Sequence, residues 1–303
     1  MEQNFETCLY NVIDASKVQK DEPMKKHTTF RIGGPADYFI MPSNEKELTA
    51  AVRVCRKFSI PIYIVGNGSN LLVGDKGFRG AIIQLYKSMG TFQVEGNQIT
   101  AQAGCSLAQI ANAALDAALT GFEFAAGIPG TLGGAVVMNA GAYGGEMKDV
   151  LTSVRVMTEE GEIMELPAEE LGLGYRTSII PEKRYIVLGA VISLTEGKKE
   201  EIKAQMDDLR QKRVSKQPLE YPSAGSTFKR PEGYFAGKLI QDSGLKGFTV
   251  GGAQVSEKHS GFVINKGNAT AADVMELIRQ VTAKVKEDTG VTMEPEVKQI
   301  GEF

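Results

Sequence analysis

The sequence predicts an α+β protein built from more than one domain. Its 303 residues are enough for one large domain or for two to three modest ones. The first 90 residues alternate strand-like and helix-like segments, and short alternating strands follow. A charged, helix-favouring stretch at 197–216 then leads into a loop rich in Pro, Gly and Ser, which indicates a domain boundary. We predict domains at 1–90, 91–208 and 209–296, with the closing strand 297–303 able to return to the first.

The first domain is predicted to be βαβ-like after an N-terminal arm. Residues 1–26 form this arm, with some helix, and DYFIMP (37–42) is typical of a strand. Ser43 can cap a helix whose apolar face carries Leu48, Ala51, Val52, Cys55 and Phe58. Three apolar strands are expected after it, at 61–65, 71–73 and 81–85.

The second domain is predicted to be richer in strands. Alternation over 91–104 favours short strands, and Ser106 can cap a helix with an apolar face from Leu107 to Ala118. A hairpin is expected over 153–166, turning near Glu160-Gly161, and 185–194 is typical of a buried strand.

The third domain has two predicted helices and a strand. A helix is expected at 236–244 and a strand at 262–265. A capping box from Thr270 to Asp273 opens the last helix, and Gly290 ends it before an extended C-terminal segment.

Composition excludes several classes of function. The net charge of −3 argues against broad attraction to nucleic acid or to an anionic membrane. The chain shows no run of apolar residues long enough to span a bilayer and no signal-peptide pattern at its start. Three scattered cysteines, with neither a disulfide framework nor a metal-binding spacing, fit a reducing cytoplasm. We therefore expect a cytoplasmic protein without a metal site.

Glycine is concentrated in two loops. Val65 to Val73 (VGNGSNLLV) follows a strand, but it lacks the third glycine and the following helix of a Rossmann dinucleotide site. It can still form an anion-binding nest, or it can simply be a tight turn. Ala125 to Met147 contains many small residues, which allow a large ligand to approach the backbone; a tightly packed crossover is the alternative.

These two loops resemble the UDP-N-acetylenolpyruvoylglucosamine reductase family. GNGSNLLV (66–73) is followed about sixty residues later by GIPGTLGGAVVMNAGAYGGE (127–146). The resemblance continues over nearly the whole chain, in the motifs TTFRIGGPAD (28–37), GYRTS (174–178), PSAGSTFKRP (222–231), GLKGFTVGGAQVS (244–256) and EPEV (294–297). The short spacing from Arg176 to Arg213 resembles the family branch that lacks an extra tyrosine-bearing loop.

The resemblance implies a fold and a reaction. The fold would be an FAD-binding module of the vanillyl-alcohol-oxidase type in two subdomains, 1–90 and 91–208, with a substrate-binding domain at 209–296. NADPH would reduce non-covalent FAD, which would then reduce UDP-N-acetylglucosamine-enolpyruvate to UDP-N-acetylmuramate for peptidoglycan. Both partners are small molecules, and we infer no nucleic acid, membrane or obligate protein partner.

The resemblance also implies the residues that hold FAD. One group would bind the pyrophosphate: Gly66, Asn67, Gly68, Ser69 and Asn70. A second group would line the remaining length of the cofactor: Gly127, Ile128, Gly130, Thr131, Gly133, Gly134 and Asn139.

Three catalytic residues follow from the same motifs. Arg176 would bind the substrate carboxylate through its planar guanidinium, and Glu296 would assist with the charge that develops there. Ser226 has no histidine base nearby in sequence and would donate a proton to carbon. Without the resemblance, Arg176 reads as a surface arginine and Ser226 as a turn serine bonded to its own backbone.

Four further residues would contact the substrate. Tyr175, Arg213, Lys216 and Lys229 lie close to these catalytic motifs in the sequence, where cations suit a diphosphate. Arg230 stands where the family often has Asn, so a substrate contact is not assigned to it. Solvated surface charges remain the alternative for the lysines and Arg213, and core packing for Tyr175.

Two other functions fit parts of the pattern. A flavin oxidase would share the FAD module, but EPEV and AGSTFK argue against it. A non-catalytic nucleotide-sugar-binding flavoprotein would keep the fold, yet Arg176, Ser226 and Glu296 are all present.

Overall fold

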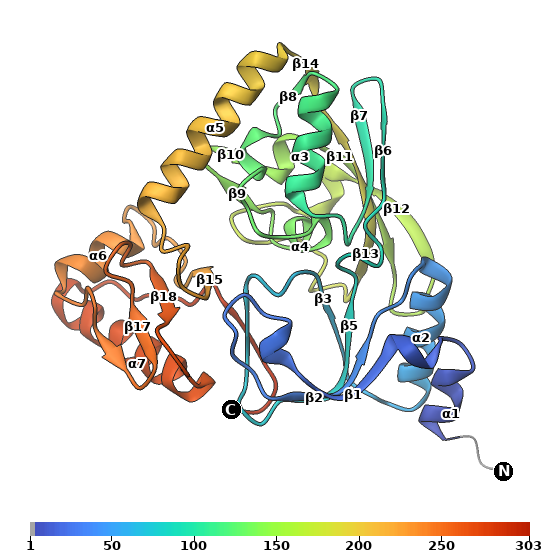
Figure 1. Cartoon of the computed structure of the whole chain (residues 1–303), viewed down its shortest axis with the longest axis horizontal. Coiled ribbons are helices and arrows are strands. Elements are labelled where there is room, and N and C mark those ends of the chain that lie inside the picture. The colour runs from blue at the N-terminus through green and yellow to red at the C-terminus, as the bar shows by residue number, and fades with distance from the viewer. Residues whose placement is uncertain (1–3) are drawn as a thin grey trace. The chain divides into compact units, whose positions relative to one another are not determined.

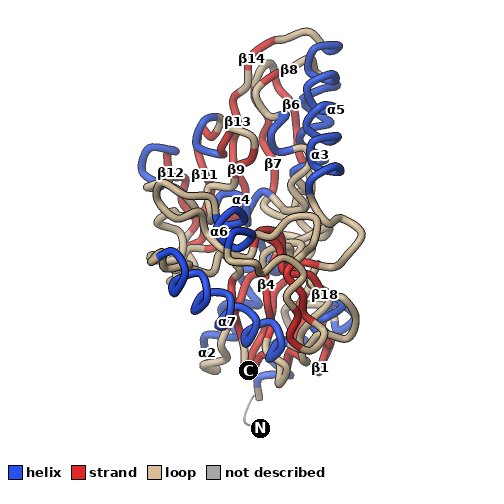
Figure 2. The backbone as a smooth tube through the Cα atoms, turned by 90° about the vertical axis from the view of Figure 1, so that its left-hand side faces the viewer, coloured by secondary structure: helices blue, strands red, loops and turns tan. Residues whose placement is uncertain are grey.

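The computed structural model describes residues 4–303 and contains both helices and mainly antiparallel sheets, as expected of an α+β protein (Figures 1 and 2). It divides into two compact units. The first consists of Met1–Gln19, Tyr38–Asn67 and Ala81–Lys212, and the second of Lys20–Asp37, Gly68–Gly80 and Arg213–Phe303. No helix among the described residues combines the length and the apolar character that crossing a membrane requires.

The first unit is built on a five-stranded antiparallel sheet in the order β12-β11-β13-β7-β6. Its strands are β6 (Phe92–Glu95), β7 (Gln98–Gln102), β11 (Leu151–Met157), β12 (Ile163–Pro167) and β13 (Ile186–Ser193). β11 and β12 form the predicted hairpin, which turns at Gly161 with a φ of 86°. Each of these strands corresponds to a segment that the sequence predicts to be a strand.

The helices of the first unit bury one face. α2 (Glu45–Lys57) buries Leu48, Ala51, Val52 and Cys55, as its periodicity predicts. Its cap is Asn44 rather than the predicted Ser43, because the Asn44 side chain accepts a 2.9 Å hydrogen bond from the Glu47 N–H. α3 (Leu107–Asp116) begins with the predicted capping box at Ser106.

One long helix and several shorter elements complete the first unit. The predicted N-terminal arm contains α1 (Phe5–Tyr10), while its first three residues lie outside those described. The remaining elements are α4 (Leu132–Val137), α5 (Lys199–Lys216), β8 (Leu119–Thr120), β9 (Gly141–Ala142), β10 (Gly145–Glu146) and β14 (Thr195–Glu196). α5 runs past the boundary of the unit and buries only Ile202 among its residues.

A four-stranded sheet has the order β1-β2-β5-β3. Its strands are β1 (Val18–Pro23), β2 (Pro35–Ile40), β5 (Phe78–Gln84) and β3 (Ile62–Val65). The last two pair in parallel, Ile62 opposite Ala81. Three of the boundaries between the units fall within β1, β2 and β5.

The second unit contains an antiparallel sheet in the order β15-β18-β17-β16. Its strands are β15 (Ser223–Ser226), β16 (Thr249–Val250), β17 (Ala253–Val255) and β18 (Phe262–Asn265), with helices α6 (Ala236–Asp242) and α7 (Ala271–Thr289). α7 begins with the predicted capping box at Thr270 and ends at Gly290. Its buried Val274, Leu277 and Val281 share one apolar core with Phe30 and Leu72, from far earlier in the chain.

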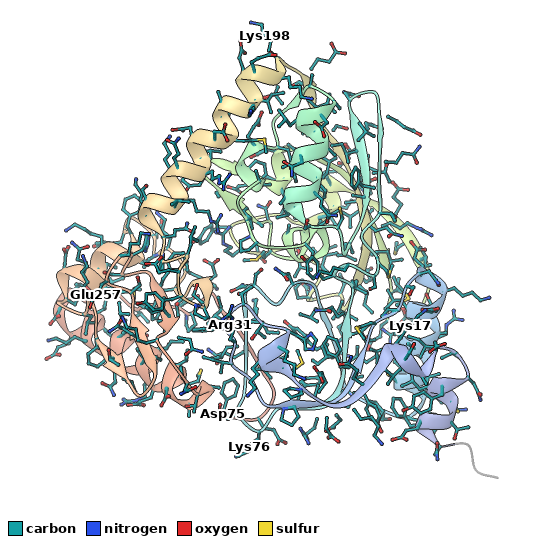
Figure 3. All side chains as sticks on the ribbon, in the orientation of Figure 1. Lys17, Arg31, Asp75, Lys76, Lys198 and Glu257 are labelled. Carbon is teal, nitrogen blue, oxygen red and sulfur yellow. The ribbon has the colours of Figure 1, made fainter. Side chains whose placement is uncertain are left out.

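The C-terminal strand ties this core to the loop after β3. β19 (Lys298–Ile300) pairs in parallel with β4 (Leu71–Val73). Asp75, labelled in Figure 3, accepts hydrogen bonds of 2.8 and 2.9 Å from the amides of Ala271 and Ala272 at the start of α7. The loop that carries Gly68 to Asn70 is thereby anchored from two sides within the second unit.

Candidate active site

The two predicted glycine loops meet in the first unit. Gly66 directly follows β3, and a Cβ at this position would lie only 2.2 Å from Oγ1 of Thr131. The Asn67 side chain donates a 2.8 Å hydrogen bond from Nδ2 to the carbonyl oxygen of Pro129. Residues about sixty positions apart in the sequence therefore form one surface.

The second loop exposes glycines, whose backbone carries no side chain, to solvent. Gly127 and Gly134 are exposed, and Ile128 and Gly130 are half-buried. A Cβ on Gly134 would meet only Thr131 Oγ1, at 3.8 Å, so the space beside this glycine is open. Gly134 lies in the first turn of α4, where amides lack acceptors within the helix.

Two further residues of this loop are buried. Gly133 is buried, and a Cβ there would lie 2.9 Å from that of Ala103. Asn139, 1% exposed, donates from Nδ2 to Glu146 Oε2 at 2.7 Å and to the Gly174 carbonyl at 3.1 Å. The structure therefore shows Asn139 bracing the turn that carries Arg176.

Arg176 lies at the tip of a tight turn. Gly174 and Thr177 exchange backbone hydrogen bonds across it, and Arg176 has a φ of 54°. This left-handed conformation costs a residue with a side chain roughly 1–2 kcal/mol. The guanidinium donates to the Gly141 carbonyl at 3.4 Å and lies 5.2 Å from the centre of the Tyr175 ring. Tyr175 is 52% exposed. The alternative that Tyr175 packs in the core is therefore wrong.

In the second unit, Gly68 and Asn70 are fixed by the backbone around them. Gly68 has a φ of 61°, and its carbonyl accepts a 3.2 Å hydrogen bond from the Thr29 N–H. A Cβ on Gly68 would lie 2.1 Å from the His27 carbonyl oxygen, so only glycine fits. Ser69 is half-buried between them.

Ser226 and Glu296 come together in this unit. Ser226 ends β15, after an irregular register at Gly225, whose φ is 77°. The carbonyl of the next residue, Thr227, accepts a 2.8 Å hydrogen bond from the Glu296 N–H. Within residues 4–303 the Ser226 hydroxyl makes no hydrogen bond. The alternative that Ser226 is a turn serine bonded to its own backbone is therefore excluded.

The neighbouring acid is engaged elsewhere. Glu294 forms a 3.0 Å ion pair with Lys229, whose N–H also donates to the Glu294 carbonyl at 2.8 Å. Glu296 is half-buried, whereas Glu294 is exposed. The two glutamates of EPEV therefore have different surroundings. Glu294 pairs with Lys229, and the main chain of Glu296 lies beside the strand that ends in Ser226.

Further cations lie on the second unit. Arg213 and Lys216 occupy the last turn of α5, and Arg230 stacks with its guanidinium carbon 4.0 Å from the centre of the Phe235 ring. His259 accepts a 3.1 Å hydrogen bond at Nδ1 from the Gly261 N–H. Burial lowers the pKa of His259, and the charge of Lys216 lowers it further. Among the described residues no group of His, Cys, Asp and Glu is arranged to hold a metal ion.

Comparison with known proteins decides the family. An FAD binding domain model matches residues 36–167, and a model of the UDP-N-acetylenolpyruvoylglucosamine reductase C-terminal domain matches residues 217–300. The UDP-N-acetylenolpyruvoylglucosamine reductase of Agathobacter rectalis is 55% identical over 315 aligned positions, covering 100% of both chains. The chain belongs to the UDP-N-acetylenolpyruvoylglucosamine reductase family.

Comparison with two other members of the family supports the same assignment. The enzyme of that name from Caldanaerobacter subterraneus is 56% identical over 97% of this chain and 97% of its own. The crystal structure of the reductase from Thermus caldophilus has a TM-score of 0.81 and 38% identity, covering 94% of this chain and 98% of that one. The resemblance seen in the sequence is therefore confirmed.

The FAD-binding module is confirmed as well. The grass pollen allergen Phl p 4, a protein with glucose dehydrogenase activity, is only 16% identical but gives a TM-score of 0.53 over 65% of this chain and 45% of that one. At this identity the likeness concerns the fold alone. It fits the FAD-binding domain match at 36–167.

The residues of the reductase fit an FAD cofactor. A dinucleotide diphosphate needs amide and hydroxyl donors on a backbone that it can approach closely. Gly134 offers open space in the first turn of a helix, Thr131 Oγ1 lies beside it, and Thr131 does not use its side chain to cap α4. Side chains larger than hydrogen at Gly127 or Gly134 would cover this exposed backbone.

Tyr143 is a further exposed aromatic residue in this region, and the sequence did not single it out. It is 46% exposed at the tip of the β9–β10 hairpin, with a φ of 54°. Gly141, in the same hairpin, accepts the hydrogen bond from Arg176. In the sequence, Tyr143 is an aromatic residue within a run of small ones, GAYGG. Small residues pack closely, so a tyrosine among them could have been recognised as an exposed side chain.

Proposed function

We propose that this protein uses NADPH and FAD to reduce UDP-N-acetylglucosamine-enolpyruvate to UDP-N-acetylmuramate in peptidoglycan precursor synthesis. The full-length identity to reductases of that name carries the proposal. The fold and the candidate residues support it, because a glycine-lined FAD surface accompanies an arginine, a serine and a glutamate in the motifs of the family.

The first unit would hold most of the cofactor. Gly66, Asn67, Gly127, Gly130 and Gly134 offer backbone that FAD can approach, and Thr131 adds a hydroxyl. Gly68, Ser69 and Asn70 would bind the pyrophosphate, while Gly133 and Asn139 would shape the surface by packing. In the domain division proposed from the sequence, 1–90 and 91–208 would bind FAD and 209–296 would bind the substrate.

When bound, FAD would supply the hydride-transfer chemistry that links NADPH to the enolpyruvyl double bond. Arg176 would bind the substrate carboxylate, where negative charge accumulates, through two parallel hydrogen bonds. Its guanidinium keeps its charge at any working pH. To assist with the same charge, Glu296 would have to be protonated or to share a proton.

Ser226 would supply the proton that completes the reduction. Its O–H bond breaks as a C–H bond forms at the carbon next to the carboxylate, and solvent then returns a proton to the serine oxygen. Because its hydroxyl makes no hydrogen bond within residues 4–303, it is available for such a transfer. Arg213, Lys216 and Lys229 would neutralise the substrate diphosphate, and Tyr175 and Tyr143 would contact the substrate beside Arg176.

The purified protein tests this assignment directly. We expect a yellow protein whose denaturation releases FAD, and NADPH oxidation that accelerates when UDP-N-acetylglucosamine-enolpyruvate is added. Oxidation that responds to oxygen but not to this substrate would favour a flavin oxidase, and binding without turnover would favour a nucleotide-sugar-binding protein. We also propose a cytoplasmic location, where both substrates are expected and where free cysteines stay reduced.

A further inference from the structure

Asn70 holds the main chain on the C-terminal side of Glu296. The Asn70 Nδ2 donates to the Glu296 main-chain carbonyl oxygen at 3.3 Å. The main-chain carbonyl of Asn70 accepts a hydrogen bond from the Lys298 N–H at 3.0 Å. These two contacts span the Val297 residue between them. Parallel pairing of β4 with β19 continues from this point, so the local register is fixed.

The N-terminal side of Glu296 is held by Thr227. The Glu296 N–H donates to the Thr227 carbonyl at 2.8 Å. Thr227 is itself fixed twice, because its N–H donates to the Gly261 carbonyl at 2.9 Å and its Oγ1 accepts the Val263 N–H at 3.0 Å. Glu296 therefore depends on Asn70 at one end and on the strand of Ser226 at the other.

We propose that Asn70 is a positioning residue for Glu296, acting through the main-chain hydrogen bond from its side-chain amide. The proposal deepens the function above and rests on the role given there to Glu296. Asn70 would thus connect the glycine loop of the cofactor to the acid that acts on the substrate. A loss of this contact should affect the reduction of the enol ether more than the reduction of FAD by NADPH.

The amide group suits this task and a carboxylate does not. Asn70→Asp has nearly the same shape but offers oxygen where a donor is needed, so two acceptors would face each other. Asn70→Ser shortens the side chain and removes the contact without adding charge. Displacing a catalytic group by a fraction of an ångström is expected to slow the step it assists by about 10-fold or more.

The matched control is Asn67→Asp. Asn67 belongs to the same loop and also donates Nδ2 to a backbone carbonyl, that of Pro129, which belongs to the other glycine loop and not to the strand of Glu296. Both Asp variants change the charge of the loop by the same amount. Only the Asn70 variant should act through Glu296.

The test is a double-mutant cycle with Glu296→Gln in rapid-mixing measurements of the two half-reactions. We expect Asn70→Asp and Asn70→Ser to slow flavin reoxidation by the enol ether about 10-fold relative to flavin reduction, and to add little in the Glu296→Gln background. Asn67→Asp should add its full effect in that background. Full additivity of the Asn70 variants with Glu296→Gln, or equal slowing of both half-reactions, overturns the proposal.

Two outcomes separate this proposal from the proposed function. If Glu296→Gln reoxidises at the normal rate, the role of Glu296 is wrong and the positioning role falls with it. If Glu296→Gln is slow but the Asn70 effect is additive, only the positioning role is wrong. Hydrogen exchange on the purified full-length protein gives a readout without turnover: segment 294–298 should exchange faster in both Asn70 variants than in Asn67→Asp, and equal exchange contradicts the contact.

Discussion

The main-chain N–H of Glu296 donates a 2.8 Å hydrogen bond to the carbonyl oxygen of Thr227, which places Glu296 beside the strand that ends in Ser226. Glu296 and Ser226 are seventy positions apart in the sequence, yet their segments are joined by backbone atoms rather than by flexible side chains. A backbone link of this kind makes the spacing between an acid and a proton donor reproducible.

Ser226→Ala should slow flavin reoxidation by the enol ether far more than flavin reduction by NADPH. A positioned proton donor contributes roughly 10²–10⁴-fold, and the alanine has no proton to give. Ser223→Ala, at the other end of β15, is the matched control. Equal slowing of both half-reactions in Ser226→Ala would show that Ser226 is structural.

Arg176 can be compared with Arg184, because both have left-handed backbone, with φ of 54° and 52°. Glycine at either position removes a strain of about 1 kcal/mol. Arg184→Gly loses only an exposed ion pair with Glu159 and should raise the melting temperature slightly without loss of turnover. Arg176→Gly should lose turnover without a matching loss of stability, as measured by thermal denaturation beside steady-state kinetics. An active Arg176→Gly would contradict a carboxylate-binding role.

Gly66 and Gly134 should respond differently to alanine. Gly66→Ala forces a Cβ against buried Thr131, so it should destabilise the fold by about 1–3 kcal/mol and weaken FAD binding. Gly134→Ala has room and better helix propensity, so it should stabilise the FAD-depleted protein by up to about 1 kcal/mol while weakening FAD binding. Melting curves and FAD titrations distinguish the two. Tight FAD binding by Gly134→Ala would argue against cofactor approach at this backbone.

His259 should make folding stability depend on pH below neutrality. Burial lowers its pKa below the usual 6.5, so the unfolded chain binds a proton more readily than the folded one. The contribution is therefore complete above pH 6.5 and is lost as the pH falls through the lower pKa of the folded protein. His259→Asn can still accept from Gly261 but does not titrate, so its unfolding free energy should fall less between pH 7 and pH 5. Identical pH profiles would show that His259 is not the cause.

Local patterns predicted most helices and strands, because each carries its own signal. The capping boxes at Ser106 and Thr270, and the 3.6-residue periodicity of α2 and α7, are visible in the sequence and present in the structure. The cap at Asn44 was missed because Ser43 and Asn44 are both good caps and only the backbone conformation chooses between them.

Long-range contacts were less accessible. The glycines of 125–147 indicated a close approach without showing which would be exposed, as at Gly134, and which buried, as at Gly133. The conformation of Arg176 and the contact between Asn70 and Glu296 depend on tertiary packing, which leaves no periodic signal. The roles of Arg176, Ser226 and Glu296 came from family motifs, since each residue alone is commonplace.

The most direct test of the account is anaerobic rapid mixing of the NADPH-reduced protein with UDP-N-acetylglucosamine-enolpyruvate. We predict that the oxidised flavin spectrum returns within the turnover time, that UDP-N-acetylmuramate forms in equal amount, and that both changes slow together in Ser226→Ala. A flavin that stays reduced until oxygen is admitted would contradict it.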